Sequence, residues 1–189
     1  MSSDWFSGES HRLRCELELA EELGTAFQLC DQFTYDNVFI KFQPGSGKTT
    51  LGKRLAEWFE TPFFIDGDEF RSLFGNTNYG KMGRENNIRN SIAVATYLNK
   101  KGQALGSNFK NHSIVVSMVN PYERLRKELA ANNPNQTILV LLKSNRDLRR
   151  EYHVSNFEDG KPNLTLSTDK PEEVSFHELT SFVSQKQIH

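Results

Sequence analysis

The sequence predicts an α/β protein of three layers, in which a parallel five-stranded sheet carries helices on both faces. Short apolar runs alternate with helical patterns from Asn37 to the C-terminus. Several of the runs are continuous in Val, Ile and Phe without polar alternation, which is typical of strands covered on both faces. With 189 residues, the chain is long enough for one domain with a sizeable core.

The strands and helices are expected in the following order. The strands are expected at residues 38–42, 63–65, 114–119, 137–142 and 163–166. The helices are expected at residues 48–59, 84–101, 121–131 and 171–184. One face of the first helix is expected to be apolar, with Leu51, Leu55, Trp58 and Phe59. Asn120 is expected to cap the third helix, and the polar stretch 102–113 is expected to be a surface loop.

The first 36 residues differ from the rest of the chain. They are charged, and Leu13, Leu17 and Ala20 form an apolar stripe at helical spacing. We therefore expect an N-terminal helical extension at 1–36, followed by the main domain at 37–189. A surface helix is the simpler interpretation, and a helix that binds a partner is the alternative.

Composition excludes several classes of protein. The 23 Lys and Arg nearly balance the 24 Asp and Glu, so no general nucleic-acid surface is expected. The two cysteines, Cys15 and Cys30, make neither a disulfide framework nor a zinc pattern. No apolar run is long enough to cross a bilayer, and the polar first ten residues lack the apolar stretch of a signal peptide. These features predict a cytoplasmic protein that does not bind a membrane.

Residues 38–51 read VFIKFQPGSGKTTL, a buried strand, a glycine-containing loop and the start of an amphipathic helix. This is the setting of a phosphate-binding loop, whose backbone amides and helix N-terminus attract the phosphates of ATP. Lys48 is expected to reach the β- and γ-phosphates, and Thr49 to place its hydroxyl on Mg²⁺. The expected ATP-binding residues of the loop are Pro44, Gly45, Ser46, Gly47, Lys48, Thr49 and Thr50.

The loop departs from the full pattern at one position, where Phe42 stands in place of the first glycine. A side chain there is expected to distort the start of the loop or to weaken ATP binding. A chance glycine-rich turn is the alternative, which the strand before the loop and the helix after it disfavour.

Two carboxylates, Asp66 and Asp68, follow the second predicted strand in the stretch FFIDGDEFR. In an open α/β sheet, ligands bind at the carboxyl ends of the strands. One carboxylate can hold Mg²⁺ while the other accepts a proton from the attacking hydroxyl. A solvated turn with a helix-capping Asp is the alternative interpretation of the same residues.

The pieces GSGKTT, IDGDEFR, RENNIR and VSMVNPYERLR, in this order, resemble adenylylsulfate kinases from residue 38 to about residue 142. The resemblance implies a P-loop kinase fold, use of ATP and Mg²⁺, and typically a homodimer. It implies transfer of the γ-phosphoryl of ATP to the 3′-hydroxyl of adenosine 5′-phosphosulfate, giving 3′-phosphoadenylyl sulfate. It assigns catalysis to Asp68, Lys48 and Asp66, with Thr49 and Asp66 at the metal. It assigns nucleotide-substrate binding to Arg71, Arg84, Asn87 and Arg126.

The chain departs from this family at the acceptor loop and in the lid. Asn120 and Glu123 replace a serine and an arginine of the family. The lid, expected at about 144–162, is shorter than in the family and is arginine-rich, and Arg149 is expected to bind ATP. Two alternatives therefore stay open. One is a related kinase for another small anionic nucleotide, for example a cytidine diphosphoramidate. The other is a nucleotide-binding protein with little catalysis.

Overall fold

The structure is a computed structural model that describes residues 37–41, 43–105, 113–133, 137–146 and 153–187. Its elements belong to one compact unit, Thr34–Gln187. The expected helical extension at 1–36 lies outside the described residues, as do Phe42, Arg149 and both cysteines.

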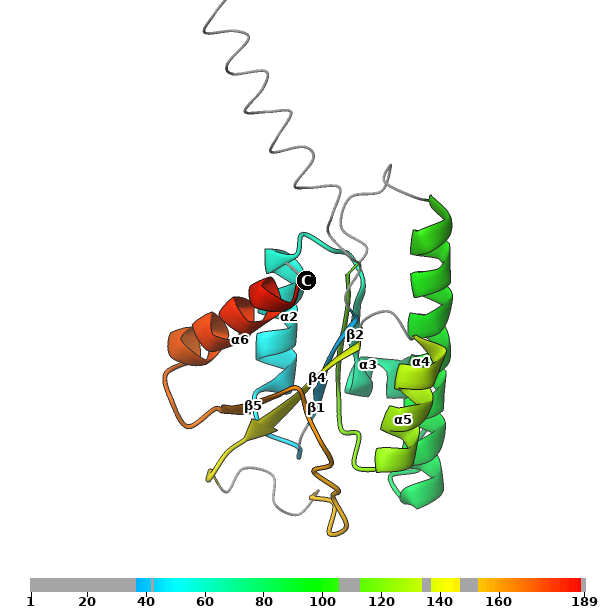
Figure 1. The fold of residues 1–189 in the computed structure, drawn as a ribbon. Helices are drawn as coiled ribbons and strands as arrows, with labels where there is room; N and C mark the ends of the chain where they lie inside the picture. The colour runs from blue at the N-terminus through cyan, green and yellow to red at the C-terminus, as the bar shows by residue number, and fades with distance from the viewer. Residues whose placement is uncertain (1–36, 42, 106–112, 134–136, 147–152, 188–189) are drawn as a thin grey trace, which may run out of the picture. The chain divides into compact units, whose positions relative to one another are not determined.

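The described strands form one five-stranded sheet in the order β2-β3-β1-β4-β5. All four pairings are parallel, which confirms the predicted fold class (Figure 1). The strands are β1 (Asn37–Lys41), β2 (Phe64–Asp66), β3 (Ile114–Met118), β4 (Thr137–Lys143) and β5 (Leu164–Ser167). Because β1 lies at the centre, the loop that follows it has neighbouring strand ends on both sides.

Helices cover both faces of the sheet (Figure 1). One face carries α2 (Lys48–Trp58) and α6 (Glu172–Gln187). The other face carries α4 (Lys81–Leu105) and α5 (Glu123–Asn132). A short helix, α3 (Gly67–Leu73), begins where β2 ends. In the part of the chain that the structure describes, no helix is long and apolar enough to cross a membrane.

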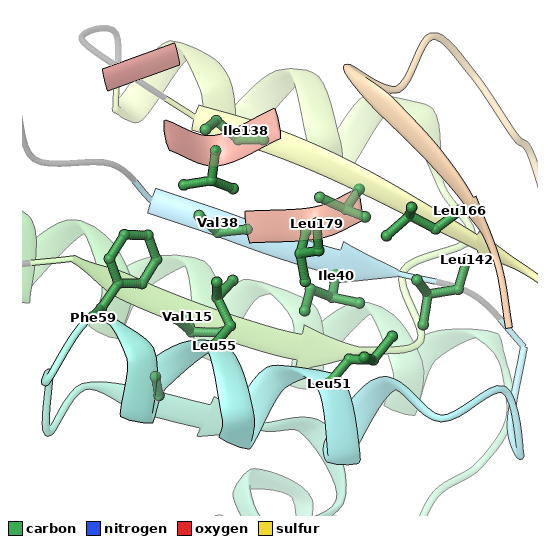
Figure 2. Packing of buried hydrophobic residues seen from close by; sticks show 13 residues of the cluster. Val38, Ile40, Leu51, Leu55, Phe59, Val115, Ile138, Leu142, Leu166 and Leu179 are labelled. Atoms are coloured by element: carbon green, nitrogen blue, oxygen red, sulfur yellow. The ribbon is translucent and has the colours of Figure 1, made fainter. Parts of the chain in front are cut away.

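Two apolar cores result from this layering. On the α2 and α6 face, Leu51 and Leu55 pack with Val38, Ile40 and Leu179 (Figure 2). On the other face, α4 and α5 bury a second cluster against the sheet, with Ile65, Ile88, Ile92, Ala95, Ile114, Val116, Met118, Leu125 and Leu129. Each fully buried side chain of this kind contributes about 1.5–3 kcal/mol.

One glycine sets how closely α2 approaches the sheet. A Cβ added at Gly52 would lie 2.7 Å from the ring of Phe64 and 3.0 Å from Cβ of Ser117. A larger residue at this contact requires a shift of the helix or of the Phe64 ring. The N-terminal turn of α2 is therefore held close to the carboxyl ends of β2 and β3, one turn before Gly52.

Several local expectations were wrong. Helix α4 continues to Leu105, so residues 102–105 are helical and not part of a loop. Helix α5 begins at Glu123 with Tyr122 in the cap position, so Asn120 does not cap it. Trp58 is 42% exposed although its spacing suggested the core. An apolar stripe predicts a face of a helix, but the width of the buried face depends on what packs against it.

Candidate functional site

The phosphate loop has the backbone geometry that its sequence predicts. Gly45 and Gly47 have φ angles of 82° and 84°, in the left-handed region that favours glycine. Gly47 occupies the N-cap position of α2, where no side chain caps the helix, and the first turn of α2 carries no acidic residue. The amides and the dipole at this helix end therefore face the loop and attract an anion.

Lys48 is buried at the base of this loop. Its ammonium donates to the backbone carbonyl of Gln43 at 2.7 Å and lies 3.4 Å from the Ser46 hydroxyl. The loop thus holds the lysine that the motif assigns to the phosphates, with its charge directed into the loop.

Asp66 joins the loop to the second strand end. Its Oδ2 accepts a hydrogen bond of 2.7 Å from the Thr49 hydroxyl. Its Oδ1 accepts from the backbone N–H groups of Asp68 and Glu69 at 2.9 and 3.2 Å, so Asp66 also caps α3. Asp66 therefore caps a helix, as the alternative interpretation expected, and also contacts Thr49, as expected for a metal site.

The pair of oxygens from Thr49 and Asp66 suits Mg²⁺, which prefers hard oxygen ligands and takes the rest of its shell from water and substrate phosphates. Among the described residues, no group of three or more His, Cys, Asp or Glu is gathered as for a metal held by protein alone. A site of one carboxylate and one hydroxyl fits the class of metal that arrives with a nucleotide. Asp68 is exposed in the first turn of α3.

The residues expected to bind the nucleotide substrate lie in different environments. Arg71 is buried and donates to the carbonyl of Asn78 at 2.8 Å, while its guanidinium stacks 4.5 Å from the ring centre of Tyr79. In this structure it therefore supports the connection between α3 and α4. Asn87 is buried, donates to the Gly67 carbonyl at 2.9 Å, and its Oδ1 has no hydrogen-bond partner among the described residues.

Arg84 lines a pocket of about 380 Å³. The pocket combines three cationic side chains with an aromatic ring and one carboxylate. Its lining residues are Lys81, Arg84, Tyr122, Arg124, Val154, Ser155, Asn156 and Glu158. Burial raises the pKa of Tyr122, so its phenol stays neutral and available as a hydrogen-bond donor. The chemistry of the lining suits a small anion that carries a polar or aromatic group.

Arg126 does not line this pocket but supports a segment that does. It is buried and donates to the carbonyl of Asn120 at 2.9 Å and to the carbonyl of Glu158 at 2.7 Å. Burial lowers the pKa of this guanidinium. The arginine joins the loop after β3 to the segment 153–160, which we call the strap (Figure 1).

Lys41 is a buried cation in the same region that the motifs did not indicate. Its ammonium donates to the Asp159 carbonyl. Burial, reinforced by Arg126, lowers the pKa of Lys41 from its ordinary value of 10.5 to about 8, against the opposing effects of Asp159, Glu123 and Glu158. Nothing in the sequence marks this lysine, because a strand otherwise apolar gives no warning of a buried charge.

A second pocket, of about 160 Å³, lies on the other side of the phosphate loop. It is lined by Gly47, Thr50, Leu51, Arg146, Thr168, Lys170, Glu172 and Ser175. Arg146 is held there by the Thr168 hydroxyl at 3.2 Å and the Ser144 hydroxyl at 3.1 Å. Thr168 and Lys170 were missed by the sequence reasoning, since the β5–α6 connection carries no motif.

Comparison with known proteins finds similarity to kinases. No protein-family model matches the chain. The adenylyl-sulfate kinase of Deinococcus deserti is 34% identical over 98 residues, which are 49% of this chain and 49% of that protein. The cytidine diphosphoramidate kinase of Campylobacter jejuni is 36% identical over 62 residues, 31% of this chain and 36% of that protein. The aligned region thus spans about half the length, or less, of these curated relatives.

Solved structures share the fold. The APS kinase of Mycobacterium tuberculosis, in complex with AMPPNP and APS, superposes with a TM-score of 0.63 at 19% identity, covering 79% of this chain and 98% of that one. A gluconokinase from Sinorhizobium meliloti superposes with a TM-score of 0.60 at 16% identity, covering 80% of this chain and 93% of that one. The chain is a P-loop protein of the kinase fold class. Over 98 residues it is also similar to an adenylyl-sulfate kinase, in line with the resemblance of its motifs.

Proposed function

We propose that this protein is a phosphotransferase that moves the γ-phosphoryl group of ATP to a hydroxyl of a small anionic nucleotide. The observation that carries the proposal is the 2.7 Å hydrogen bond between Thr49 and Asp66 beside Lys48. It brings the phosphate loop and a carboxylate to one point, as phosphoryl transfer with Mg²⁺ requires.

The residues divide the reaction between them. Lys48 and the amides at the start of α2 bind the β- and γ-phosphates, and Thr49 and Asp66 would hold the metal ion. When bound, Mg²⁺ would supply positive charge that neutralises the phosphates of the nucleotide. Asp68, exposed in the first turn of α3, would accept the proton of the attacking hydroxyl. The pocket beside Thr50 and Arg146 is the proposed place of the nucleoside of ATP.

For the acceptor, our leading candidate is adenosine 5′-phosphosulfate, phosphorylated on its 3′-hydroxyl. The similarity to the Deinococcus deserti enzyme supports it, and the cationic pocket around Arg84 suits an anionic nucleotide. The second candidate is a cytidine diphosphoramidate or a similar nucleotide. The Campylobacter jejuni relative supports it, and so does Asn120, which stands where the family has a serine.

The test is a coupled assay of ADP release with Mg-ATP, with and without each acceptor, on wild type and on Asp68→Ala. Glu69→Gln, which alters the neighbouring exposed carboxylate of α3, is the matched control. We expect acceptor-dependent ADP release that Asp68→Ala reduces on the order of 100-fold and Glu69→Gln leaves unchanged. ATP binding without transfer to any acceptor would contradict the proposed activity and leave a nucleotide-binding protein.

The assembly needs a separate measurement. We propose a homodimer, as in the family that the motifs resemble. Light scattering on the full chain and on a variant lacking residues 1–36 tests this and asks whether the extension contributes. A mass of one chain for the full-length protein would contradict the dimer. An unchanged number of chains per particle after the deletion would exclude the extension from the interface.

A further inference from the structure

The strap, residues 153–160, has no helix or strand of its own, yet it forms one wall of the pocket around Arg84. Val154, Ser155, Asn156 and Glu158 line the pocket together with Lys81, Arg84 and Arg124. An irregular segment takes a fixed position only where the rest of the fold satisfies its backbone groups. The question is which residues hold the strap in place.

At one end, the phosphate loop holds the strap through one side chain. The amide of Gln43 donates to the Val154 carbonyl at 2.9 Å and accepts from the Val154 N–H at 2.8 Å. Two such bonds to one residue fix both the position and the orientation of its backbone. Val154 itself is buried, so water does not compete freely for these groups.

At the other end, buried cations bind strap carbonyls. Arg126 donates to the carbonyl of Glu158 at 2.7 Å, and Lys41 donates to the next carbonyl, that of Asp159. The Glu158 N–H donates to the Pro121 carbonyl at 3.0 Å. This end therefore depends on the sheet and on α5, whereas the Val154 end depends on the phosphate loop.

Gln43 also contacts the lysine that binds phosphate. Its backbone carbonyl accepts a 2.7 Å hydrogen bond from the Lys48 ammonium. One residue thus links the phosphate-binding cation, through its main chain, to the pocket wall, through its side chain. Bound phosphates would attract the Lys48 ammonium and alter its hydrogen bond to the Gln43 carbonyl. A resulting shift of Gln43 would move its side-chain amide, which is bonded to Val154.

We propose that Gln43 is a positioning residue that couples occupancy of the phosphate loop to the wall of the acceptor pocket through Val154. The proposal rests on the proposed function, because it takes the two sites to be those of ATP and of its acceptor. It predicts that the strap becomes better ordered when the loop holds phosphates, and that the coupling is lost when the Gln43 amide is removed.

The first test is amide hydrogen exchange of the full chain with and without Mg-AMPPNP at saturation, on wild type, Gln43→Leu and the control Gln185→Leu. Gln185 lies exposed on α6, so its variant makes the same chemical change outside both sites. We expect nucleotide to slow exchange of peptides spanning the strap on the order of tenfold in wild type and in Gln185→Leu. In Gln43→Leu the same nucleotide should leave the strap unchanged.

A second variant tests the other end of the strap without altering the phosphate loop. Gly160 has a φ of 62°, and a Cβ there would lie 2.7 Å from the guanidinium of Arg126. Gly160→Ala should therefore loosen the strap and raise the KM of the acceptor on the order of tenfold, with the KM of ATP changed less than about threefold. Gln43→Leu should show the same division between the two KM values.

The outcomes separate the two proposals. Bound AMPPNP with equal strap protection in wild type and in Gln43→Leu would overturn the coupling and leave the proposed function intact. Nucleotide-dependent protection without phosphoryl transfer to any acceptor would support the coupling and contradict the proposed kinase. Failure of wild type to bind AMPPNP would overturn both. Equal increases of both KM values in Gln43→Leu would identify a general structural role and refute the positioning role.

Discussion

Replacing Asp66 with asparagine or with alanine separates the charge of this side chain from its hydrogen bonds. Oδ1 caps α3 through two backbone N–H groups, at 2.9 and 3.2 Å, and Oδ2 accepts from Thr49 at 2.7 Å. Asparagine keeps the capping oxygen, and its amide can donate to the Thr49 hydroxyl. Asp66→Asn should therefore stay within about 1 kcal/mol of the wild-type free energy of unfolding.

Alanine removes all of these contacts. Loss of the cap costs about 1 kcal/mol and loss of the bond to Thr49 costs about 1–1.5 kcal/mol, so Asp66→Ala should lose about 2–2.5 kcal/mol. Urea unfolding followed by circular dichroism measures both variants. If Asp66→Asn proves as unstable as Asp66→Ala, the accounting by hydrogen bonds is wrong.

Turnover should fall in both variants, although only Asp66→Ala loses much stability. Asparagine is a poor Mg²⁺ ligand compared with a carboxylate, so both variants should lose turnover on the order of 100-fold at moderate Mg²⁺. High Mg²⁺ should restore part of the turnover of Asp66→Asn, because its loop remains intact. Wild-type turnover and Mg²⁺ dependence in Asp66→Asn would refute the assignment of Asp66 to the metal.

Three further predictions concern residues around the site. Arg71→Met should lower the free energy of unfolding by about 2 kcal/mol, because it removes the donor to the Asn78 carbonyl; urea unfolding measures it, and an unchanged midpoint would favour a purely substrate-binding role. Arg146→Ala should raise the KM of ATP on the order of tenfold with little change for the acceptor, and equal changes in both would contradict its placement beside Thr50. Because burial lowers the pKa of Lys41 to about 8, the native state releases this proton before the unfolded chain does. Wild type should then gain about 2 kcal/mol relative to Lys41→Met between pH 7 and about pH 9.5, and parallel stability curves for the two proteins would show that the ammonium is not buried as the structure has it.

The sequence was sufficient for the frame of the molecule. The parallel sheet followed from uninterrupted Val, Ile and Phe runs, because burial on both faces leaves no need for polar alternation. The meeting of Thr49 with Asp66 followed from two motifs at the carboxyl ends of β1 and β2, although β3 lies between these strands in the sheet. Both inferences rest on local patterns whose spatial outcome the topology of an open sheet determines.

Other parts of the site could not be predicted from local patterns. The segment after Asp66 forms α3 with this carboxylate as its cap, and seven residues carry too weak a periodicity to predict a helix from sequence. The anchoring of the strap joins residues far apart in the chain, such as Gln43 with Val154 and Arg126 with Glu158. Side-chain bonds to a remote backbone leave no periodic signature, so only a structure reveals them.

The close contact of Gly52 with Phe64 and Ser117 links the packing of α2 on the sheet to the positions of the polar groups in this site. We expect the 2.7 Å hydrogen bond from the Thr49 hydroxyl to the Asp66 carboxylate to depend on the close approach of α2 to Phe64 and Ser117. We expect a single methyl group added at Gly52, one helical turn from the loop, to increase the distance between the Thr49 hydroxyl and the Asp66 carboxylate. We therefore expect the affinity of the proposed metal site to respond to a substitution that touches no charged atom and lines neither pocket.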